Sequence, residues 1–179
     1  IATGLDEIAR VITSETRKCE AAGDLERSYH RTFGESEFFD APAFDEVLRA
    51  RSLIDTLYTE GHPAARFVEL AALSSLIPVS RLIRRGDLRF KTPKELTKPI
   101  PRFLDAWRDY LRRIARDLRQ ADRLPQKPVL VCEDARKLAN MPHLAVDGVI
   151  TSPPYLNGTN YFRNTKVELW FLRALHDES

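Results

Sequence analysis

Apolar residues recur at helical spacing in four stretches of the chain, each separated from the next by turn residues. This spacing is typical of helices that bury one face, except that residues 64–77 are apolar nearly all round, as in a buried helix. It predicts helices over residues 7–22, 43–58, 64–77 and 101–124, with the clearest apolar stripe in the last. The intervening residues 24–41 are predicted to be irregular, and residues 80–98 to form a basic loop.

The pattern changes after Pro125. Two short apolar runs, 128–132 and 146–151, have the composition of buried strands, and residues 159–174 again have a helical pattern. Strands that alternate with helical segments predict a parallel α/β sheet. The first six residues are also consistent with the end of a strand that leads into the helix over 7–22.

Composition narrows the class of protein. The chain has 179 residues, 43% of them hydrophobic and 30% charged, which is enough to bury a core and excludes collagen, low-complexity disorder and a coiled-coil rod. The longest strongly apolar runs are about ten residues, well below the ~20 that span a bilayer. No membrane partner is therefore expected. The cysteines, Cys19 and Cys132, make no disulfide framework and predict a cytoplasmic location.

Charge is spread unevenly along the chain. The formal net charge is −6 over residues 1–80, +8 over 81–124 and zero over 125–179, which gives the overall +2. Arginines in 102–123 alternate with aspartates three or four residues away and are expected to pair with them. We therefore expect the loop over 80–98, which also contains Lys94, to contact phosphate through the cations Arg81, Arg84, Arg85, Arg89 and Lys91. The alternative is an ordinary solvated basic surface.

The residues with the clearest chemistry are Ser152, Pro153, Pro154 and Tyr155, which follow the apolar run 146–151. Two prolines stiffen the backbone and remove amide donors, so carbonyl oxygens are left as acceptors. The Ser152 hydroxyl and the Pro153 carbonyl suit the amino hydrogens of a planar base, and Tyr155 suits stacking on its ring. A Pro-Pro turn beside a packed tyrosine is the alternative interpretation.

The stretch 146–157, VDGVITSPPYLN, resembles the catalytic motif of S-adenosylmethionine-dependent methyltransferases that modify cytosine N4 or adenine N6 in DNA. Residues 161–163 and 166–170 resemble the helix that follows this motif in many of these enzymes. A serine at the start of the motif occurs more often in the cytosine-N4 enzymes. The resemblance implies a DNA partner, a duplex with one base flipped out, while the oligomeric state stays open.

The same resemblance implies residues for the cofactor, S-adenosyl-L-methionine. Residues 129–136 resemble the strand whose acidic end lies beside the cofactor's adenine, with Glu133, Asp134 and Ala135 as candidates. Residues 1–6 resemble the second strand, whose terminal Asp6 would take the ribose hydroxyls. A helix-capping role for Asp134 and an incidental surface position for Asp6 are the alternatives.

The implied fold is α/β, part of a Rossmann-like class I methyltransferase sheet with a large helical insertion. Residues 1–23 and 125–179 would belong to the catalytic core, and 24–124 would form the insertion. The family's Gly-rich turn is expected before residue 1, since nothing in the sequence matches it and the chain opens without an initiator methionine; the alternative is an incomplete cofactor site. No metal is expected, because His30, His62, His143 and His176 lack ligand spacing.

Three functions stay open from the sequence. The first is a DNA amino-methyltransferase. The second is an RNA or protein amino-group methyltransferase on the same fold, because related Pro-Pro-Tyr motifs also serve guanine and glutamine amides. The third is a nucleic-acid-binding module that keeps an inactive methylase remnant.

Overall fold

The structure, a computed structural model, describes residues 2–121, 148, 150–152 and 161–175. The chain divides into two compact units, one formed by residues 1–120 and 160–179 and the other by residues 121–159. The first unit contains nearly all of the described residues. The fold below is the fold of that unit.

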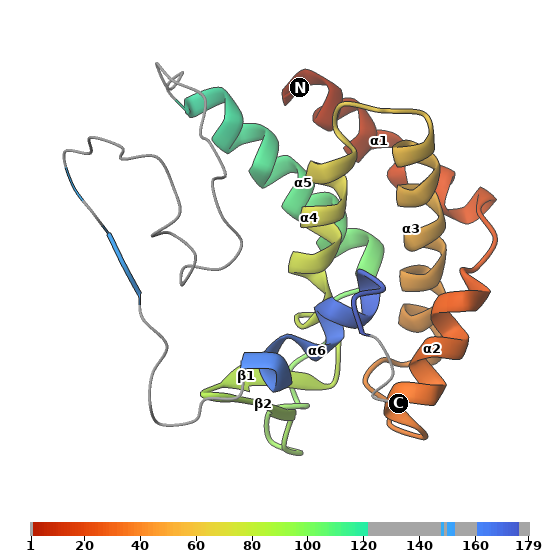
Figure 1. The fold of residues 1–179 in the computed structure, drawn as a ribbon, viewed down its shortest axis with the longest axis vertical. Helices are drawn as coiled ribbons and strands as arrows, with labels where there is room; N and C mark the ends of the chain where they lie inside the picture. Colours follow the sequence, from red (N-terminus) through yellow and green to blue (C-terminus); the bar gives the residue numbers. More distant parts are fainter. Residues whose placement is uncertain (1, 122–147, 149, 153–160, 176–179) are drawn as a thin grey trace, which may run out of the picture. The chain divides into compact units, whose positions relative to one another are not determined.

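The described residues form six helices and one β-hairpin (Figure 1). In chain order the elements are α1 (Ala2–Lys18), α2 (Gly23–Phe33), α3 (Ala41–Thr59), α4 (Ala65–Leu76), β1 (Leu82–Arg85), β2 (Asp87–Phe90), α5 (Phe103–Gln120) and α6 (Tyr161–Phe171). Strands β1 and β2 pair antiparallel, with Leu82 opposite Phe90 and Arg85 opposite Asp87.

Helix α5 forms a central part of the core because it packs along both α1 and α4 (Figure 1). It buries Phe103, Trp107 and Leu111 completely. The indole Nε1 of Trp107 donates a hydrogen bond to the Val68 carbonyl of α4 at 3.0 Å. The apolar stripe that predicted this helix is therefore the stripe that holds α4 and α5 together.

The predicted helices over 43–58, 64–77 and 101–124 are confirmed, each to within a few residues at its ends. Helix α3 begins where its sequence provides a cap, since the Asp40 side chain accepts a hydrogen bond from the Ala43 amide at 2.8 Å. Pro42 lies in the first turn, where no amide donor is needed.

The strand predicted at residues 1–6 is wrong. Residues 2–6 belong to α1, which buries Leu5, Ala9 and Ile12 against the core. These positions are three or four residues apart, so the helical period already includes the segment that we assigned to a strand. The predicted helix over 7–22 is therefore confirmed but starts earlier and ends at Lys18.

Two irregular segments of the prediction contain regular structure. Residues 24–33 are helical in α2, where Leu25 and Tyr29 lie one turn apart and are both buried. The predicted loop over 80–98 contains the hairpin β1–β2, which turns at Gly86 with a φ of 76°. A left-handed backbone of this kind suits glycine at the turn, and buried Leu82 and Leu88 fix the hairpin on the core.

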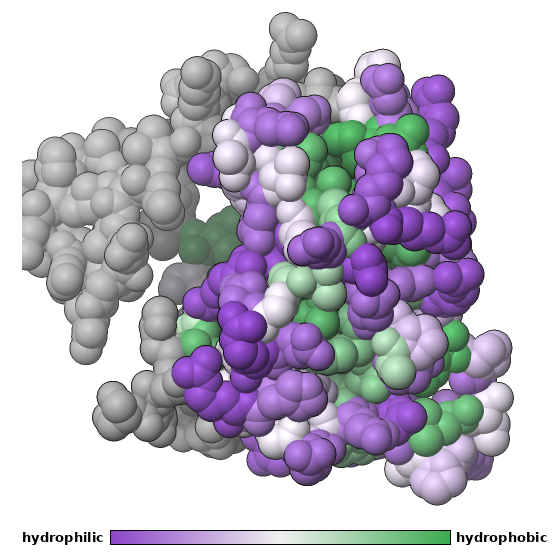
Figure 2. Space-filling model, turned by 90° about the vertical axis from the view of Figure 1, so that its right-hand side faces the viewer, coloured by the Kyte–Doolittle hydropathy of each residue, from purple (hydrophilic) through white to green (hydrophobic). Residues whose placement is uncertain are grey.

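The surface of the described helices is mainly polar. The face in Figure 2, which lies on the α2 and α3 side of Figure 1, carries hydrophilic side chains around narrower bands of apolar ones. This matches the amphipathic pattern of the sequence. Among the described residues, no helix is long and apolar enough to cross a membrane.

Candidate functional site

Only the beginning of the Ser-Pro-Pro-Tyr motif lies within the described residues. Thr151 and Ser152 are described and exposed, whereas Pro153, Pro154 and Tyr155 lie outside the described part. Of the predicted strand 146–151, the structure describes Gly148, Ile150 and Thr151, and none of these three is in a strand. The predicted strand 128–132 and the cofactor candidates Glu133, Asp134 and Ala135 also lie outside the described residues.

Asp6 is the one cofactor candidate that the structure describes, and its position does not fit that role. It lies on α1 and forms an ion pair with Arg119 of α5. A ribose-binding carboxylate is expected free at the end of a strand, while Asp6 is on a helix and has a cationic partner. The structure therefore gives Asp6 a part in the contact between α1 and α5.

Helix α6, the first described helix after the motif, is held firmly in the first unit. Val167, Trp170 and Phe171 have no exposed surface. The Trp170 Nε1 donates to the Leu25 carbonyl at 3.0 Å, across 145 positions of sequence. The helical pattern over 159–174 is confirmed by α6 from Tyr161 to Phe171, while residues 159–160 lie outside the described residues. Val167, Trp170 and Phe171 form its buried face, whereas Phe162 and Leu172 are exposed.

Asn164 of α6 holds the turn of the hairpin. Its side-chain Oδ1 accepts from the Leu88 amide at 2.6 Å, and its Nδ2 donates to the Gly86 carbonyl at 3.1 Å. Arg84 completes the contact by donating to the Asn164 carbonyl and to Glu168 Oε1, both at 2.7 Å. The polar edge of the hairpin is thus satisfied by one face of α6.

The five predicted phosphate contacts all lie on the hairpin or beside it, but they differ in their partners. Arg81 pairs with Glu37 at 2.5 Å, and Arg89 holds both oxygens of Glu95 at 2.8 and 3.0 Å. Arg84 is bound to α6 as described above. Arg85 is 3.9 Å from Glu95 with 71% of its side chain exposed, and Lys91 donates to the Ser80 carbonyl at 2.6 Å.

Two pKa shifts mark this region. Hydrogen bonds from Arg89 and from the Thr92 amide lower the pKa of Glu95 to about 2. Burial lowers the pKa of Lys91, because a partly desolvated ammonium is less stable in its charged form. The Glu95 carboxylate is therefore neutralised by Arg89. Lys91 forms no ion pair among the described residues, although the charge of Glu95 partly offsets the effect of burial on its pKa.

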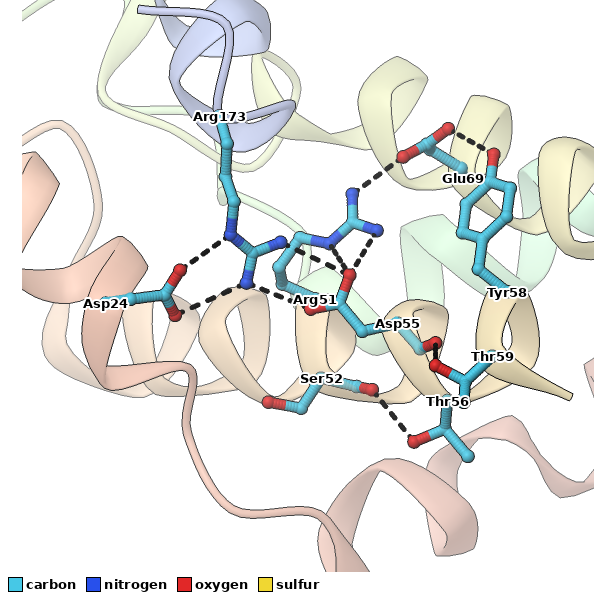
Figure 3. Close-up of polar contacts among 9 residues, drawn as sticks. All are labelled: Asp24, Arg51, Ser52, Asp55, Thr56, Tyr58, Thr59, Glu69 and Arg173. Atoms are coloured by element: carbon cyan, nitrogen blue, oxygen red, sulfur yellow. Dashed lines mark hydrogen bonds and ion pairs between the residues drawn. The ribbon is translucent and has the colours of Figure 1, made fainter. Parts of the chain in front are cut away.

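A second polar cluster joins four helices (Figure 3). Buried Arg51 of α3 donates to Asp55 at 3.0 and 2.8 Å and to Glu69 of α4 at 2.7 Å. Arg173, just after α6, contacts Asp24 at 2.6 Å and Asp55 at 2.9 Å. The hydrogen bond from Arg173 lowers the pKa of Asp24. Every acid in this cluster has a cationic partner, so the cluster stabilises the packing of the helices.

Sequence reasoning missed Asn164, Glu168, Arg51 and Arg173. Arg51 follows the expected spacing to Asp55, one helical turn away, but its burial depends on Glu69 of another helix. Asn164 gives no local signal, because both of its hairpin partners are more than seventy positions away in sequence. Among the described residues, no group of three or more metal-ligating side chains occurs.

Comparisons with known proteins found no match, so the site is interpreted from its own geometry. No protein-family model matches the chain, and neither a curated protein nor a solved structure matches it.

Proposed function

We propose that this protein transfers a methyl group from S-adenosyl-L-methionine to the exocyclic amino group of a base in DNA, with cytosine N4 favoured over adenine N6. The observation that carries the proposal is the Ser-Pro-Pro-Tyr sequence at 152–155 directly after the apolar run 146–151. The charge of +8 over residues 81–124 supports a polyanionic partner. A DNA substrate and the cysteine usage also fit the predicted cytoplasmic location.

The motif residues address the main chemical difficulty of the reaction. The exocyclic amino nitrogen of a base is a poor nucleophile because its lone pair is delocalised into the ring. In this proposal the Ser152 hydroxyl and the Pro153 carbonyl accept the amino hydrogens and let the nitrogen become pyramidal. The rest of the rate enhancement comes from holding this nitrogen in position, which removes much of the entropic cost of reaction.

Tyr155 has a separate role in the proposal. A base inside a duplex is inaccessible to an enzyme, so the target base must leave the stack. The Tyr155 ring stacks on the extruded base, an interaction worth ~1–3 kcal/mol. Since such stacking tolerates any base, Tyr155 contributes affinity, while the hydrogen-bond acceptors distinguish bases that carry an amino group.

The methyl donor supplies a reactive sulfonium, and the protein orients it. Asp6 is paired with Arg119 on the surface of α1, which does not favour its predicted role at the ribose of the donor. Glu133, Asp134 and Ala135 keep their predicted place beside the donor's adenine.

Variants of the motif test the proposal through methyl transfer from a labelled donor to duplex DNA. We expect Tyr155→Ala to lower the rate about tenfold or more, since the stack that it loses is worth ~1–3 kcal/mol. Ser152→Ala is expected to lower the rate by ~10²-fold, as removal of one positioned hydrogen-bonding group does in other active sites. The free energy of unfolding should stay unchanged in both variants.

Ser14→Ala is the matched control. It removes the hydroxyl of another exposed serine, whose bond is to the Val11 carbonyl of its own helix. This control should methylate DNA at the wild-type rate. A Tyr155→Ala variant that also keeps the wild-type rate would show that the assigned base pocket is wrong.

A further inference from the structure

A basic pocket of about 530 Å³ lies beside the hairpin, between β1 and the segment 91–100 that follows β2. Four of its lining residues are cations, namely Arg85, Lys91, Lys94 and Lys98. Its volume is within the range of ordinary ligand sites. The sequence singles out Arg85, Lys91 and Lys94 in the basic loop, but not Lys98.

The positive charge of this pocket is poorly neutralised. Glu95 is the one acid in its lining, and both of its oxygens are occupied by Arg89, with Thr92 adding bonds at 2.8 and 3.1 Å. Lys94 and Lys98 are exposed and form no side-chain ion pair within the described part of the chain. An anion in the pocket would therefore meet cations whose attraction is not already spent on a carboxylate.

The other cations of the hairpin contrast with these lysines. Arg81, Arg84 and Arg89 each donate to a glutamate at 2.5 to 2.8 Å. If one of these arginines bound a phosphate, its existing ion pair would break. The free energy lost with that pair would offset the free energy gained from the phosphate contact. Arg81, Arg84 and Arg89 are therefore held by carboxylates, whereas the lysines have no carboxylate partner among the described residues and Arg85 has only a 3.9 Å pair with Glu95.

The pocket also has apolar walls. Half-buried Ile83 and Ile100 line it, together with Pro78 and Pro99. Lys91 is partly buried at its edge, with its ammonium on the Ser80 carbonyl at 2.6 Å. Cations beside aliphatic surface suit a phosphate that is attached to an organic body such as a sugar, since each part then meets a compatible surface.

We propose that this pocket, formed by Arg85, Lys91, Lys94 and Lys98, binds the phosphate groups of nucleic acid. The sources of such a phosphate are a polynucleotide backbone and a free nucleotide, which share this chemistry. The inference goes beyond the proposed methyl transfer, because phosphate binding requires neither the motif at 152–155 nor a methyl donor.

The test measures binding of a short duplex of fixed sequence to the complete protein at several salt concentrations, without a methyl donor. The variant is Lys94→Gln with Lys98→Gln. The matched control is Arg112→Gln with Arg116→Gln, which removes the same charge from α5, where these side chains are 57% and 62% exposed. A second arm measures binding of a nucleoside diphosphate to the same proteins.

We expect the lysine variant to flatten the slope of log affinity against log salt by about 1.8, since each lost contact to B-DNA contributes ~0.9. The α5 control should keep most of the wild-type slope. Loss of nucleoside diphosphate binding alone would assign the phosphate to a free nucleotide. If the lysine variant binds both ligands as the wild type does, the pocket is not a phosphate site. The binding measurement contains no methyl donor, so failure of the methyl-transfer proposal would be seen separately, in the methylation assay.

Discussion

A single side chain, Asn164, fixes the position of the basic hairpin. Asn164 is almost fully buried, and its amide group satisfies one donor and one acceptor of the hairpin turn. Buried backbone groups of this kind are costly to leave without partners. Arg84 adds two hydrogen bonds to the same contact. The position of the pocket beside the hairpin therefore depends on Asn164, which lies far from the pocket residues in sequence.

Asn164→Ala should therefore lower the free energy of unfolding by ~1–3 kcal/mol, because it leaves the buried Leu88 amide without a partner. Urea denaturation measures this loss, and amide hydrogen exchange at Leu88 should become faster than in the wild type. Ser14→Ala is the control and should stay within ~0.5 kcal/mol, as exposed positions do. An unchanged Leu88 amide in Asn164→Ala would contradict the assigned contact.

Glu95 gives a pH-dependent prediction. Its pKa is lowered from 4.5 to about 2 in the folded protein. The contribution of the ionised carboxylate to the free energy of unfolding is therefore complete above pH ~4.5 and is lost as the pH falls toward 2. An NMR titration of the Glu95 carboxyl carbon should show a midpoint near 2. Arg89→Ala should raise this midpoint, whereas Arg81→Ala, which removes a neighbouring charge that pairs with Glu37, should not. A wild-type midpoint near 4.5 would refute the assigned ion pair.

At the scale of elements, the cluster around Arg51 joins α2, α3, α4 and the end of α6 (Figure 3). Its two arginines differ in environment. The Arg51 side chain is 5% exposed and also lies over the Phe171 ring, while the Arg173 side chain is 37% exposed. Buried ion pairs are expensive to break from one side, whereas exposed pairs contribute little.

Arg51→Ala should therefore lower the free energy of unfolding by about 3 kcal/mol, because it leaves Glu69 with a poorly solvated charge. Arg173→Ala removes the same charge and should cost less than ~1 kcal/mol. Both values come from urea denaturation of the purified variants. Equal losses for the two variants would be inconsistent with the difference in burial.

The elements that the sequence predicts well are those whose burial follows a local period. Helices α3, α4 and α5 each present an apolar stripe long enough to recognise without knowledge of the partner. Helix α2 has only Leu25 and Tyr29 on its buried side, and the hairpin strands have four residues each. These short elements depend on contacts with Trp170 and Asn164, which a local pattern does not contain.

The residues of the candidate site also differ in how well the sequence predicts them. Arg85 and Lys91 were found from the charge pattern, and the structure places both in the pocket. Lys98 became a candidate only from the structure, and the lack of carboxylate partners that distinguishes Lys94 and Lys98 was visible only in the described residues, because the sequence does not show which cations are already paired. Asp6 was misassigned for the converse reason, since its partner Arg119 is 113 positions away.

At the scale of the whole molecule, one unit is inserted into the sequence of the other. Residues 121–159, which hold the Ser-Pro-Pro-Tyr motif, leave the first unit after α5 and return to it before α6. The helices on both sides of the motif segment therefore belong to one core, with Trp107 and Trp170 fully buried. In the proposed function this core carries the basic pocket, and the segment that it flanks carries the chemistry.

Nucleoside mass spectrometry of duplex DNA tests the central claim most directly. The DNA is treated with the complete protein and a methyl donor labelled with deuterium, then digested to nucleosides. We predict labelled N4-methylcytosine with the wild type and a strong decrease with Ser152→Ala. The absence of any labelled base in the DNA, or transfer of the label to RNA or protein instead, would contradict the account.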